Sequence, residues 1–307
     1  MEHTRIEPFC LLISLLIGMA GVSQDCTVPG KEYIFTEPLT FSAIDPELRE
    51  ISGLVYIGAS IWAHNDSGGE PALYEVDDTG KITGKLTLSN AGNVDWEDVA
   101  SDNEFVYIGD FGNNRGHRTD LVIYKISLED LQLKGHISET GEIRFIYGDQ
   151  ELTKEQKRDH NFDCEALISA GDSLMIFTKN RGDLMTRIYK LPKTDGNYTL
   201  QPFACIDAGG LVTGADYHEP SGRLALVGYL NYVPFIIVAE DFSERDATFS
   251  SLTRFVLPGI SNAQTEGIVF IERNNLLVTS ERTRETNQGV FSVDLEVLTG
   301  KSFEQKE

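Results

Sequence analysis

The sequence has little cysteine, proline and positive charge. Its 307 residues include four Cys, ten Pro and 26 Lys+Arg against 48 Asp+Glu, which gives a formal net charge of −22. Four cysteines with no CxxC motif and no clustered histidine exclude a zinc site and a scaffold built on disulfides. The negative charge disfavours nucleic acid and anionic membranes as partners, because the long-range field repels both. A metal ion or a small ligand stays compatible with this composition.

Long apolar runs are also missing, apart from one at the N-terminus. Residues 8–19 read PFCLLISLLIGM, with Arg5 before them and small or polar residues after them. This pattern is typical of a secretory signal peptide, and the run is too short for a transmembrane helix. We therefore expect a signal peptide at 1–23 and a secreted or periplasmic domain at 24–307, without a membrane span and monomeric. An uncleaved anchor or a buried helix is the alternative.

Removal of the signal peptide leaves three cysteines, Cys26, Cys164 and Cys205. One disulfide is compatible with an oxidising compartment. The sequence leaves the pairing open.

The rest of the chain shows almost no helical periodicity. Short runs rich in β-branched and aromatic residues alternate with Gly, Asn and Asp turns every 8 to 15 residues. The runs fall into units of four predicted strands. The first three units are 51–57, 61–64, 72–76 and 82–88; 95–100, 105–109, 121–127 and 142–147; 163–169, 173–178, 187–191 and 199–206. The last two are 212–218, 223–229, 235–239 and 253–257; 265–271, 276–280 and 289–293.

The fifth unit lacks its outer strand, and the N-terminal segment offers one. Residues 33–36 or 39–41 have no partner in the first unit, so either run can complete the last sheet. Such closure removes exposed strand edges. The pattern predicts a single all-β domain, a five-bladed β-propeller closed by an N-terminal strand. Six blades would need a sheet within the polar segment 148–162, and a large β-sandwich is a further alternative.

The first strand of each unit carries one tripeptide: an oxygen-bearing side chain, a short residue and an apolar residue. The oxygen-bearing residues are Ser52, Glu97, Glu165, Thr213 and Glu266. In a propeller the first strands surround the axis and alternate side chains point towards it, so these oxygens should converge. The three carboxylates would repel one another unless a cation lay between them, and an oxygen-only ligand set favours Ca²⁺. The alternative is that these side chains only solvate a water-filled tunnel.

Two resemblances follow from these segments. Glu50-Ile-Ser52-Gly-Leu54-Val55 and Trp96-Glu97 resemble the inner strands of calcium-dependent soluble apyrases. That resemblance implies a five-bladed propeller with one central Ca²⁺ held by Ser and Glu side chains. The nucleotide-binding loops of that family are not recognisable in this sequence. The segments E-x-S-G-L, N-D-S-G, D-W-E-D and G-D-x-G-N-N also resemble a group of secreted bacterial propeller proteins, which implies fold more than activity.

The loops between second and third strands should lie on the same face as the starts of the inner strands. These loops are 64–70, 109–118, 178–186, 228–234 and 279–287, and they balance basic and acidic residues in an otherwise acidic chain. We expect them to hold a small anionic molecule or another extracellular ligand. The candidate contacts are Asn65, Asn113, Asn114, Arg115, Lys179, Arg181, Tyr229, Glu281 and Arg282. The alternative is that these loops are turns with solvated side chains.

Three residues of these loops are candidates for catalysis. His64 and Asp66 can act in acid–base chemistry, and Asp110 can position a water. With Ca²⁺ they would form a hydrolase of a small anionic ester, such as a phosphoanhydride, a phosphoester or a lactone. The alternative is a calcium-stabilised propeller that binds a glycan, a peptide or an envelope partner without chemistry. The sequence has no P-loop, G-x-S-x-G or H-E-x-x-H motif.

Overall fold

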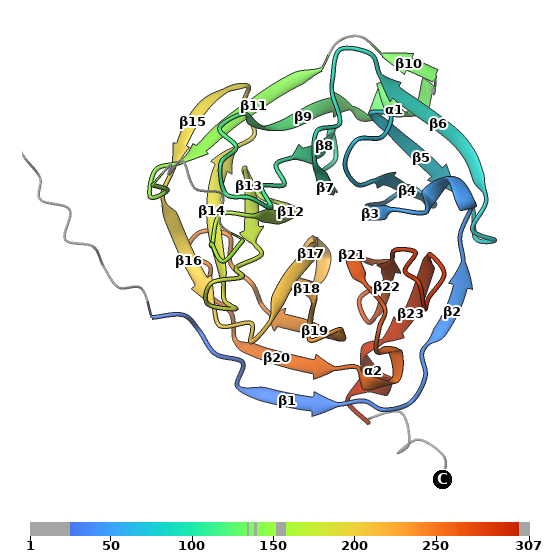
Figure 1. Cartoon of the computed structure of the whole chain (residues 1–307), viewed down its shortest axis with the longest axis vertical. Helices are drawn as coiled ribbons and strands as arrows, with labels where there is room; N and C mark the ends of the chain where they lie inside the picture. Colours follow the sequence, from blue (N-terminus) through green and yellow to red (C-terminus); the bar gives the residue numbers. More distant parts are fainter. Residues whose placement is uncertain (1–24, 134, 138–139, 152–157, 301–307) are drawn as a thin grey trace, which may run out of the picture.

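The predicted strands form five sheets arranged in a ring around one axis (Figure 1). The computed structural model describes residues 25–133, 135–137, 140–151 and 158–300. The fold is the all-β, five-bladed propeller predicted from the strand pattern. The predicted signal peptide lies outside the described residues.

Blades 1 to 3 are antiparallel meanders, with the first strand of each nearest the axis. Blade 1 contains β3 (Ile51–Ile57), β4 (Ser60–Asn65), β5 (Ala72–Val76) and β6 (Ile82–Leu88). Blade 2 contains β7 (Trp96–Ser101), β8 (Phe105–Asp110), β9 (Leu121–Ser127) and β11 (Gly141–Tyr147). Blade 3 contains β12 (Cys164–Ala170), β13 (Ser173–Thr178), β14 (Thr186–Pro192) and β16 (Pro202–Ile206).

Blades 4 and 5 complete the ring. Blade 4 contains β17 (Leu211–His218), β18 (Arg223–Leu230), β19 (Val233–Glu240) and β20 (Ser251–Val256). Blade 5 contains β21 (Thr265–Phe270), β22 (Asn275–Ser280) and β23 (Gly289–Asp294), and its fourth strand is β2 (Thr40–Ala43). The N-terminal closure is therefore confirmed, and of the two predicted runs 39–41 is the one that overlaps β2. Run 33–36 overlaps β1 (Lys31–Ile34), which pairs with β20 of blade 4 instead.

Additional strands cover the outer edges of three blades. Each pairs in parallel with the fourth strand of its blade: β10 (Gly135–Ile137) with β6, β15 (Gly196–Leu200) with β11, and β1 with β20. The predicted strand 199–206 is thus divided, because β15 joins blade 2 while β16 stays in blade 3. Covered edges cannot template pairing with another chain.

The N-terminal segment is fixed to blade 3 by a disulfide between Cys26 and Cys205. Beside it, the Thr27 N–H donates to the Cys205 carbonyl at 3.0 Å. From there the segment follows blades 4 and 5 as β1 and β2 (Figure 1). Cys164 is free and buried in the core.

The blades pack closely where their inner strands meet. A Cβ on Gly53 would lie 2.7 Å from the Cα of Asp98, and a Cβ on Gly267 would lie 2.4 Å from the carbonyl oxygen of Ser52. Both distances are too short for a side chain, which explains the short middle residue of these tripeptides. Apolar side chains fill the space between the sheets farther from the axis.

Helical segments are short. They are α1 (Leu128–Leu133), α2 (Leu295–Leu298) and the 3-10 turns η1 (Pro46–Leu48), η2 (Glu219–Ser221) and η3 (Pro258–Ile260). Within the described ranges, the chain contains no helix with the length and apolar character needed to cross a membrane.

Candidate functional site

Acidic side chains gather at the end of the axis where the inner strands begin. Seven carboxyl groups of the described residues influence one another there, and we call them the mouth cluster. They belong to Asp66, Asp95, Glu97, Asp163, Glu165, Glu266 and Glu281. Four of these residues are almost fully buried, and Asp66, Asp95 and Glu281 are partly buried.

A β-bulge places the signature residue of every inner strand. The antiparallel pairing with the second strand skips one or two residues at the same point in all five blades, and the skipped residues include Ser52, Glu97, Glu165, Thr213 and Glu266. A bulge frees a residue from the ladder and redirects its side chain. The bulges therefore bring together the register that the sequence predicted.

Two further acids come from the residues just before inner strands. Asp95 precedes β7 and lies two residues before Glu97, while Asp163 precedes β12 and lies two residues before Glu165. In extended chain, residues i and i+2 share one face, so each Asp joins the Glu that follows it. Asp66 reaches the same place from the turn after β4.

The mouth cluster contains two groups of three carboxylates with the spacing of a metal site. One is Asp66, Asp95 and Glu97, and the other is Glu97, Asp163 and Glu165. In each group, one oxygen per residue lies within 4.8 Å of the others. Ca²⁺ binds oxygen at about 2.3–2.6 Å, so two ligands of one ion are separated by about 5 Å at most. Both groups fit that limit, and Glu97 belongs to both.

Two cations of the chain already serve the second group. The Lys179 Nζ lies 2.9 Å from the Glu165 carboxylate, and the Arg181 guanidinium pairs with Asp163. Lys179 is buried together with its partner. These ion pairs leave less negative charge for a bound metal in the group of Glu97, Asp163 and Glu165.

The first group has no such compensation. No Lys or Arg in the described part of the chain forms an ion pair with Asp66, Asp95 or Glu97. Asp66 accepts from the Ser67 N–H, and the Asn114 side chain hydrogen-bonds to Asp95. The Glu97 side chain is 4% exposed, and no described residue donates a hydrogen bond to its carboxylate.

Burial and mutual repulsion change the protonation of these acids. Burial, and then the charge of Asp95, raises the pKa of Asp66 to about 7. Burial, and then Asp163, raises the pKa of Asp95 to about 6. Burial, followed by the charge of Glu165, raises the pKa of Glu97 well above its usual range. In the metal-free protein these acids therefore hold protons more tightly than exposed acids do.

The remaining acids of the mouth cluster behave alike. Burial raises the pKa of Glu165 and of Glu266, while Lys179 opposes the rise in both. Burial, and then Glu266, raises the pKa of Glu281 to about 9. Although burial opposes it, the charges of Glu165 and Glu266 raise the pKa of Lys179 well above its usual value.

A glycine leaves the space that the acids occupy. A Cβ on Gly112 would lie 2.0 Å from the Glu97 Oε1 and 2.5 Å from the Asp95 carboxyl carbon. The Gly112 N–H also donates to the Asp95 carbonyl at 3.1 Å. Any side chain at this position would therefore displace the group of Asp66, Asp95 and Glu97.

The two hydroxyl residues of the predicted metal set have partners in the neighbouring blade. The Ser52 hydroxyl donates to the Glu97 carbonyl at 2.5 Å, and the Thr213 hydroxyl donates to the Thr265 carbonyl at 2.7 Å. Both join one inner strand to the next. The structure thus brings the predicted Glu97, Glu165 and Glu266 together with other acids, while Ser52 and Thr213 connect blades.

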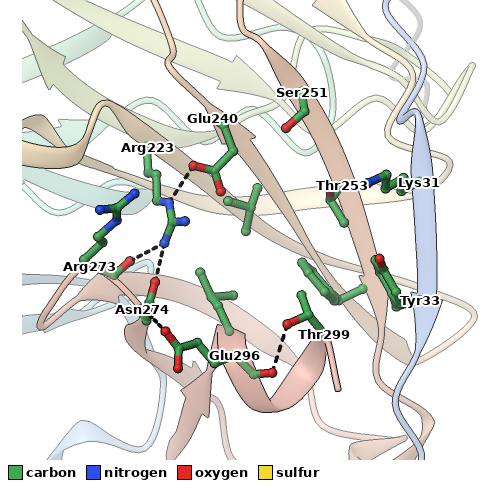
Figure 2. Close-up of a pocket in the computed structure, with 13 residues that line it drawn as sticks. Lys31, Tyr33, Arg223, Glu240, Ser251, Thr253, Arg273, Asn274, Glu296 and Thr299 are labelled. Atoms are coloured by element: carbon green, nitrogen blue, oxygen red, sulfur yellow. Dashed lines mark hydrogen bonds and ion pairs between the residues drawn. The ribbon is translucent and has the colours of Figure 1, made fainter. Parts of the chain in front are cut away.

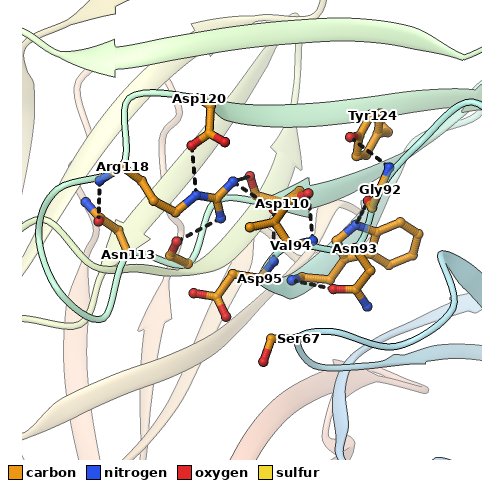
Figure 3. Close-up of polar contacts among 12 residues, drawn as sticks. Ser67, Gly92, Asn93, Val94, Asp95, Asp110, Asn113, Arg118, Asp120 and Tyr124 are labelled. Atoms are coloured by element: carbon orange, nitrogen blue, oxygen red, sulfur yellow. Dashed lines mark hydrogen bonds and ion pairs between the residues drawn. The ribbon is translucent and has the colours of Figure 1, made fainter.

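Of the predicted catalytic residues, only Asp66 lies in the mouth cluster. His64 is fully buried, its ring meets the Trp96 ring edge-on with centroids 5.5 Å apart, and burial lowers its pKa to about 4. Asp110 is also buried: it accepts from the N–H groups of Val94 and Asp95, and its carboxylate lies 3.0 Å from Arg118 (Figure 3). These contacts favour structural roles for His64 and Asp110.

The predicted ligand contacts divide into framework and rim. Asn65 and Asn113 hold backbone groups of their loops, and the exposed Asn114 accepts from Arg181 at 2.8 Å. The other candidates lie at or near the surface. They are Arg115 and Arg282, both exposed, the half-buried Tyr229, whose ring centroid is 5.7 Å from the Lys179 Nζ, and Glu281, which accepts from Gln264 at 2.6 Å.

A separate cavity of about 490 Å³ lies at the outside of the ring, between blades 4 and 5 (Figure 2). Its Arg223 pairs with Glu240 at 2.8 Å and donates to the carbonyl of Arg273 at 2.9 Å. Asn274 in turn donates to Glu296 at 2.6 Å. The charged groups of this cavity satisfy one another, so the mouth cluster is the stronger candidate site.

Sequence reasoning missed Asp95, Asp163 and Asp98. The first two could have been found from a shared pattern, because an Asp stands two residues before the inner-strand Glu in blades 2 and 3. Asp98 was taken as the short middle residue of its tripeptide. It is fully buried at the axis and accepts N–H groups of Val99, Leu167 and Ala215.

Comparison with known proteins adds only similarity of fold. No family model matches the chain, and no curated protein matches it in sequence. A PQQ-bound aldose sugar dehydrogenase from Streptomyces coelicolor is 11% identical with a TM-score of 0.46, over 84% of this chain and 97% of that one. A nidogen/laminin complex is 14% identical with a TM-score of 0.44, over 81% and 77%. A hypothetical protein from Leishmania major is 13% identical with a TM-score of 0.42, over 90% and 91%.

Proposed function

We propose that this protein is a calcium-dependent binding propeller, which holds Ca²⁺ at Asp66, Asp95 and Glu97 and presents the ion to a ligand at the mouth of the ring. The observation that carries the proposal is Glu97. Its carboxylate is buried beside other acids, and no described residue donates to it. A buried carboxylate without a partner is costly, and a bound cation would remove that cost.

The charges of the neighbours favour this group of three over the other. Glu165 and Asp163 have Lys179 and Arg181 as partners, whereas Asp66, Asp95 and Glu97 offer three acidic side chains and no ion pair within the described residues. Oxygen-only ligands suit Ca²⁺. When bound, Ca²⁺ would supply a positive centre with positions for ligand oxygens. The predicted ligands Ser52 and Thr213 are replaced in this proposal by Asp66 and Asp95.

Binding rather than hydrolysis is the function that the contacts support best. His64 and Asp110 are held in the framework, and the basic residues Lys179 and Arg181 pair with acids of the chain. Hydrolysis of a small anionic ester stays a prediction from the sequence. Export also stays a prediction, supported by the disulfide between Cys26 and Cys205, since such bonds persist in oxidising compartments.

Calcium titration tests the proposal. Ca²⁺ added to chelator-treated protein should stabilise the native state by about 2.7 kcal/mol at a concentration of 100 Kd, because it binds the folded chain selectively. For a chain of this length that is a rise in Tm of roughly 5–10 °C. Glu97→Gln should abolish the rise.

Glu240→Gln is the matched control, because Glu240 pairs with Arg223 at the outside of the ring. This variant should keep the full response to Ca²⁺. An unchanged Tm of the wild type at millimolar Ca²⁺, or an equal rise in Glu97→Gln, would refute the assignment. Phosphoanhydride, phosphodiester and lactone substrates assayed with Ca²⁺ and with chelator test hydrolysis separately.

A further inference from the structure

The turn between β18 and β19 carries an unusual residue. Asn231 and Tyr232 connect the two strands, and both have positive φ, 51° and 62°. Two-residue hairpin turns of this kind favour Asn-Gly, because glycine adopts a positive φ without strain. A bulky aromatic residue in this conformation is rare and strained. Asn231 fits the preferred first position, whereas Tyr232 stands where glycine would be more stable.

The strained turn holds an exposed ring in a fixed place. The Asn262 N–H donates to the Tyr232 carbonyl at 2.8 Å. The Tyr232 ring is nearly parallel to the Tyr229 ring, with an angle of 3° between the planes and 6.4 Å between the centroids. Tyr232 is 65% exposed. Strain of this kind is concentrated at functional sites, so the exposed ring needs an explanation other than stability.

The two rings lie next to the mouth cluster. The Lys179 Nζ is 5.7 Å from the centroid of the Tyr229 ring and 2.9 Å from the Glu165 carboxylate. Glu165 in turn is close enough to Glu97 to form one group of three carboxylates with it and Asp163. A single ligand can therefore contact the tyrosines and a cation bound beside Glu97.

The chemistry of the mouth selects the kind of ligand. Lys179 and Arg181 pair with carboxylates, and the whole chain carries a net charge of −22, so an anionic ligand is disfavoured. Flat tyrosine rings offer an apolar face for the C–H face of a sugar, and hydroxyl oxygens are suitable ligands of Ca²⁺. We propose that Tyr229 and Tyr232 stack against one ring of a neutral saccharide whose hydroxyl groups reach the bound Ca²⁺. This proposal rests on the proposed function, because it requires the ion at Asp66, Asp95 and Glu97.

Saturation-transfer NMR with maltotriose, cellotriose and mannotriose at millimolar concentration tests the proposal. At least one of these probes should bind the wild type with Ca²⁺ and not with chelator. Tyr232→Gly creates the favoured Asn-Gly turn, so it should keep or raise the Tm and keep the calcium response while the saccharide affinity falls at least tenfold. Tyr56→Ala is a control for loss of a partly exposed tyrosine on β3 and should bind as the wild type does.

The outcomes separate the two proposals. Loss of both calcium and saccharide binding in Glu97→Gln, with loss of saccharide binding alone in Tyr232→Gly, supports the proposal. Saccharide binding of wild-type strength in Tyr232→Gly overturns it. Calcium binding without binding of any of the three probes, or binding of adenosine or tetramethylammonium in their place, also overturns it and leaves the calcium site intact. Failure of the calcium titration itself refutes the proposed function.

Discussion

Two adjacent acids on one strand differ in what the fold provides for them. Asp98 and Glu97 both lie on β7, and both are almost fully buried. Asp98 accepts N–H groups at 2.9, 2.8 and 3.3 Å from Val99, Leu167 and Ala215, which belong to the inner strands of blades 2, 3 and 4. Glu97 has no hydrogen-bond donor among the described residues.

The comparison distinguishes a structural acid from a binding acid. Burial raises the pKa of Asp98, while the backbone N–H groups oppose the rise. Burial raises the pKa of Glu97 too, but there the neighbouring acids add to the rise. Buried polar groups are normally satisfied by the protein, so the acid whose partners are missing is the better indicator of a ligand.

Replacement of Asp98 should have the largest effect. Asp98→Ala leaves three buried N–H groups of three inner strands unpaired, and each costs about 1–3 kcal/mol. We expect a loss of at least about 3 kcal/mol in the free energy of unfolding, measured by urea denaturation, with and without Ca²⁺. A loss below about 1 kcal/mol would mean that Asp98 does not hold the blades together.

Gly112→Ala should act on the mouth side of the comparison. Its Cβ would approach the Glu97 Oε1 to 2.0 Å, so the carboxylates must move. We expect loss of the calcium-dependent rise in Tm, which amounts to about 2–3 kcal/mol at saturation. Gly69→Ala is the matched control from a neighbouring loop, because its Cβ would meet no atom closer than 3.9 Å. A normal calcium response in Gly112→Ala would contradict the placement of the site.

The pH dependence should have the sign set by the mouth acids. The pKa values of Asp66 and Asp95 are about 7 and about 6 when folded, above about 3.9 in the unfolded chain. The native state therefore binds more protons, and its stability falls as pH rises from about 4 to about 7. We expect metal-free protein to lose on the order of 2 kcal/mol over this range. Saturating Ca²⁺ should reduce the loss, since the metal binds deprotonated ligands.

Denaturation at pH 4.5 and pH 7.5, with Ca²⁺ and with chelator, measures this effect. A metal-free protein that gains stability with rising pH would contradict the interpretation of the mouth cluster.

Glu97→Gln should give the smallest effect and the opposite sign to Asp98→Ala. Without metal, the change removes one charge from a repelling group, so we expect a gain of about 1 kcal/mol. Asp98→Asn, the corresponding change at the neighbouring residue, should destabilise. Urea midpoints in chelator compare the two. Destabilisation of similar size in both variants would remove the distinction between the two acids.

The sequence was sufficient for the blades because each inner strand is a short apolar run bounded by turns. It was not sufficient for the outer strands. β1 is exposed at every residue and has no apolar alternation that would assign it to a sheet. The run 199–206 reads as one strand, yet its two halves pair with different blades.

The candidate site was predicted in part for a similar reason. The register found Glu97, Glu165 and Glu266, because one residue per inner strand repeats along the chain. It could not show that Ser52 bonds to the next blade, since that depends on how closely two inner strands approach. Nor could it show that Lys179 pairs with Glu165, a contact within blade 3 between two strands.

The location of the bound ion tests the central claim most directly. Crystals grown with Ca²⁺ should give an anomalous difference peak about 2.3–2.6 Å from carboxylate oxygens of Glu97, Asp95 and Asp66. The same map from Gly112→Ala crystals should lack that peak. A peak on the axis between the hydroxyls of Ser52 and Thr213, or no peak beside Glu97 at saturating Ca²⁺, would contradict the account.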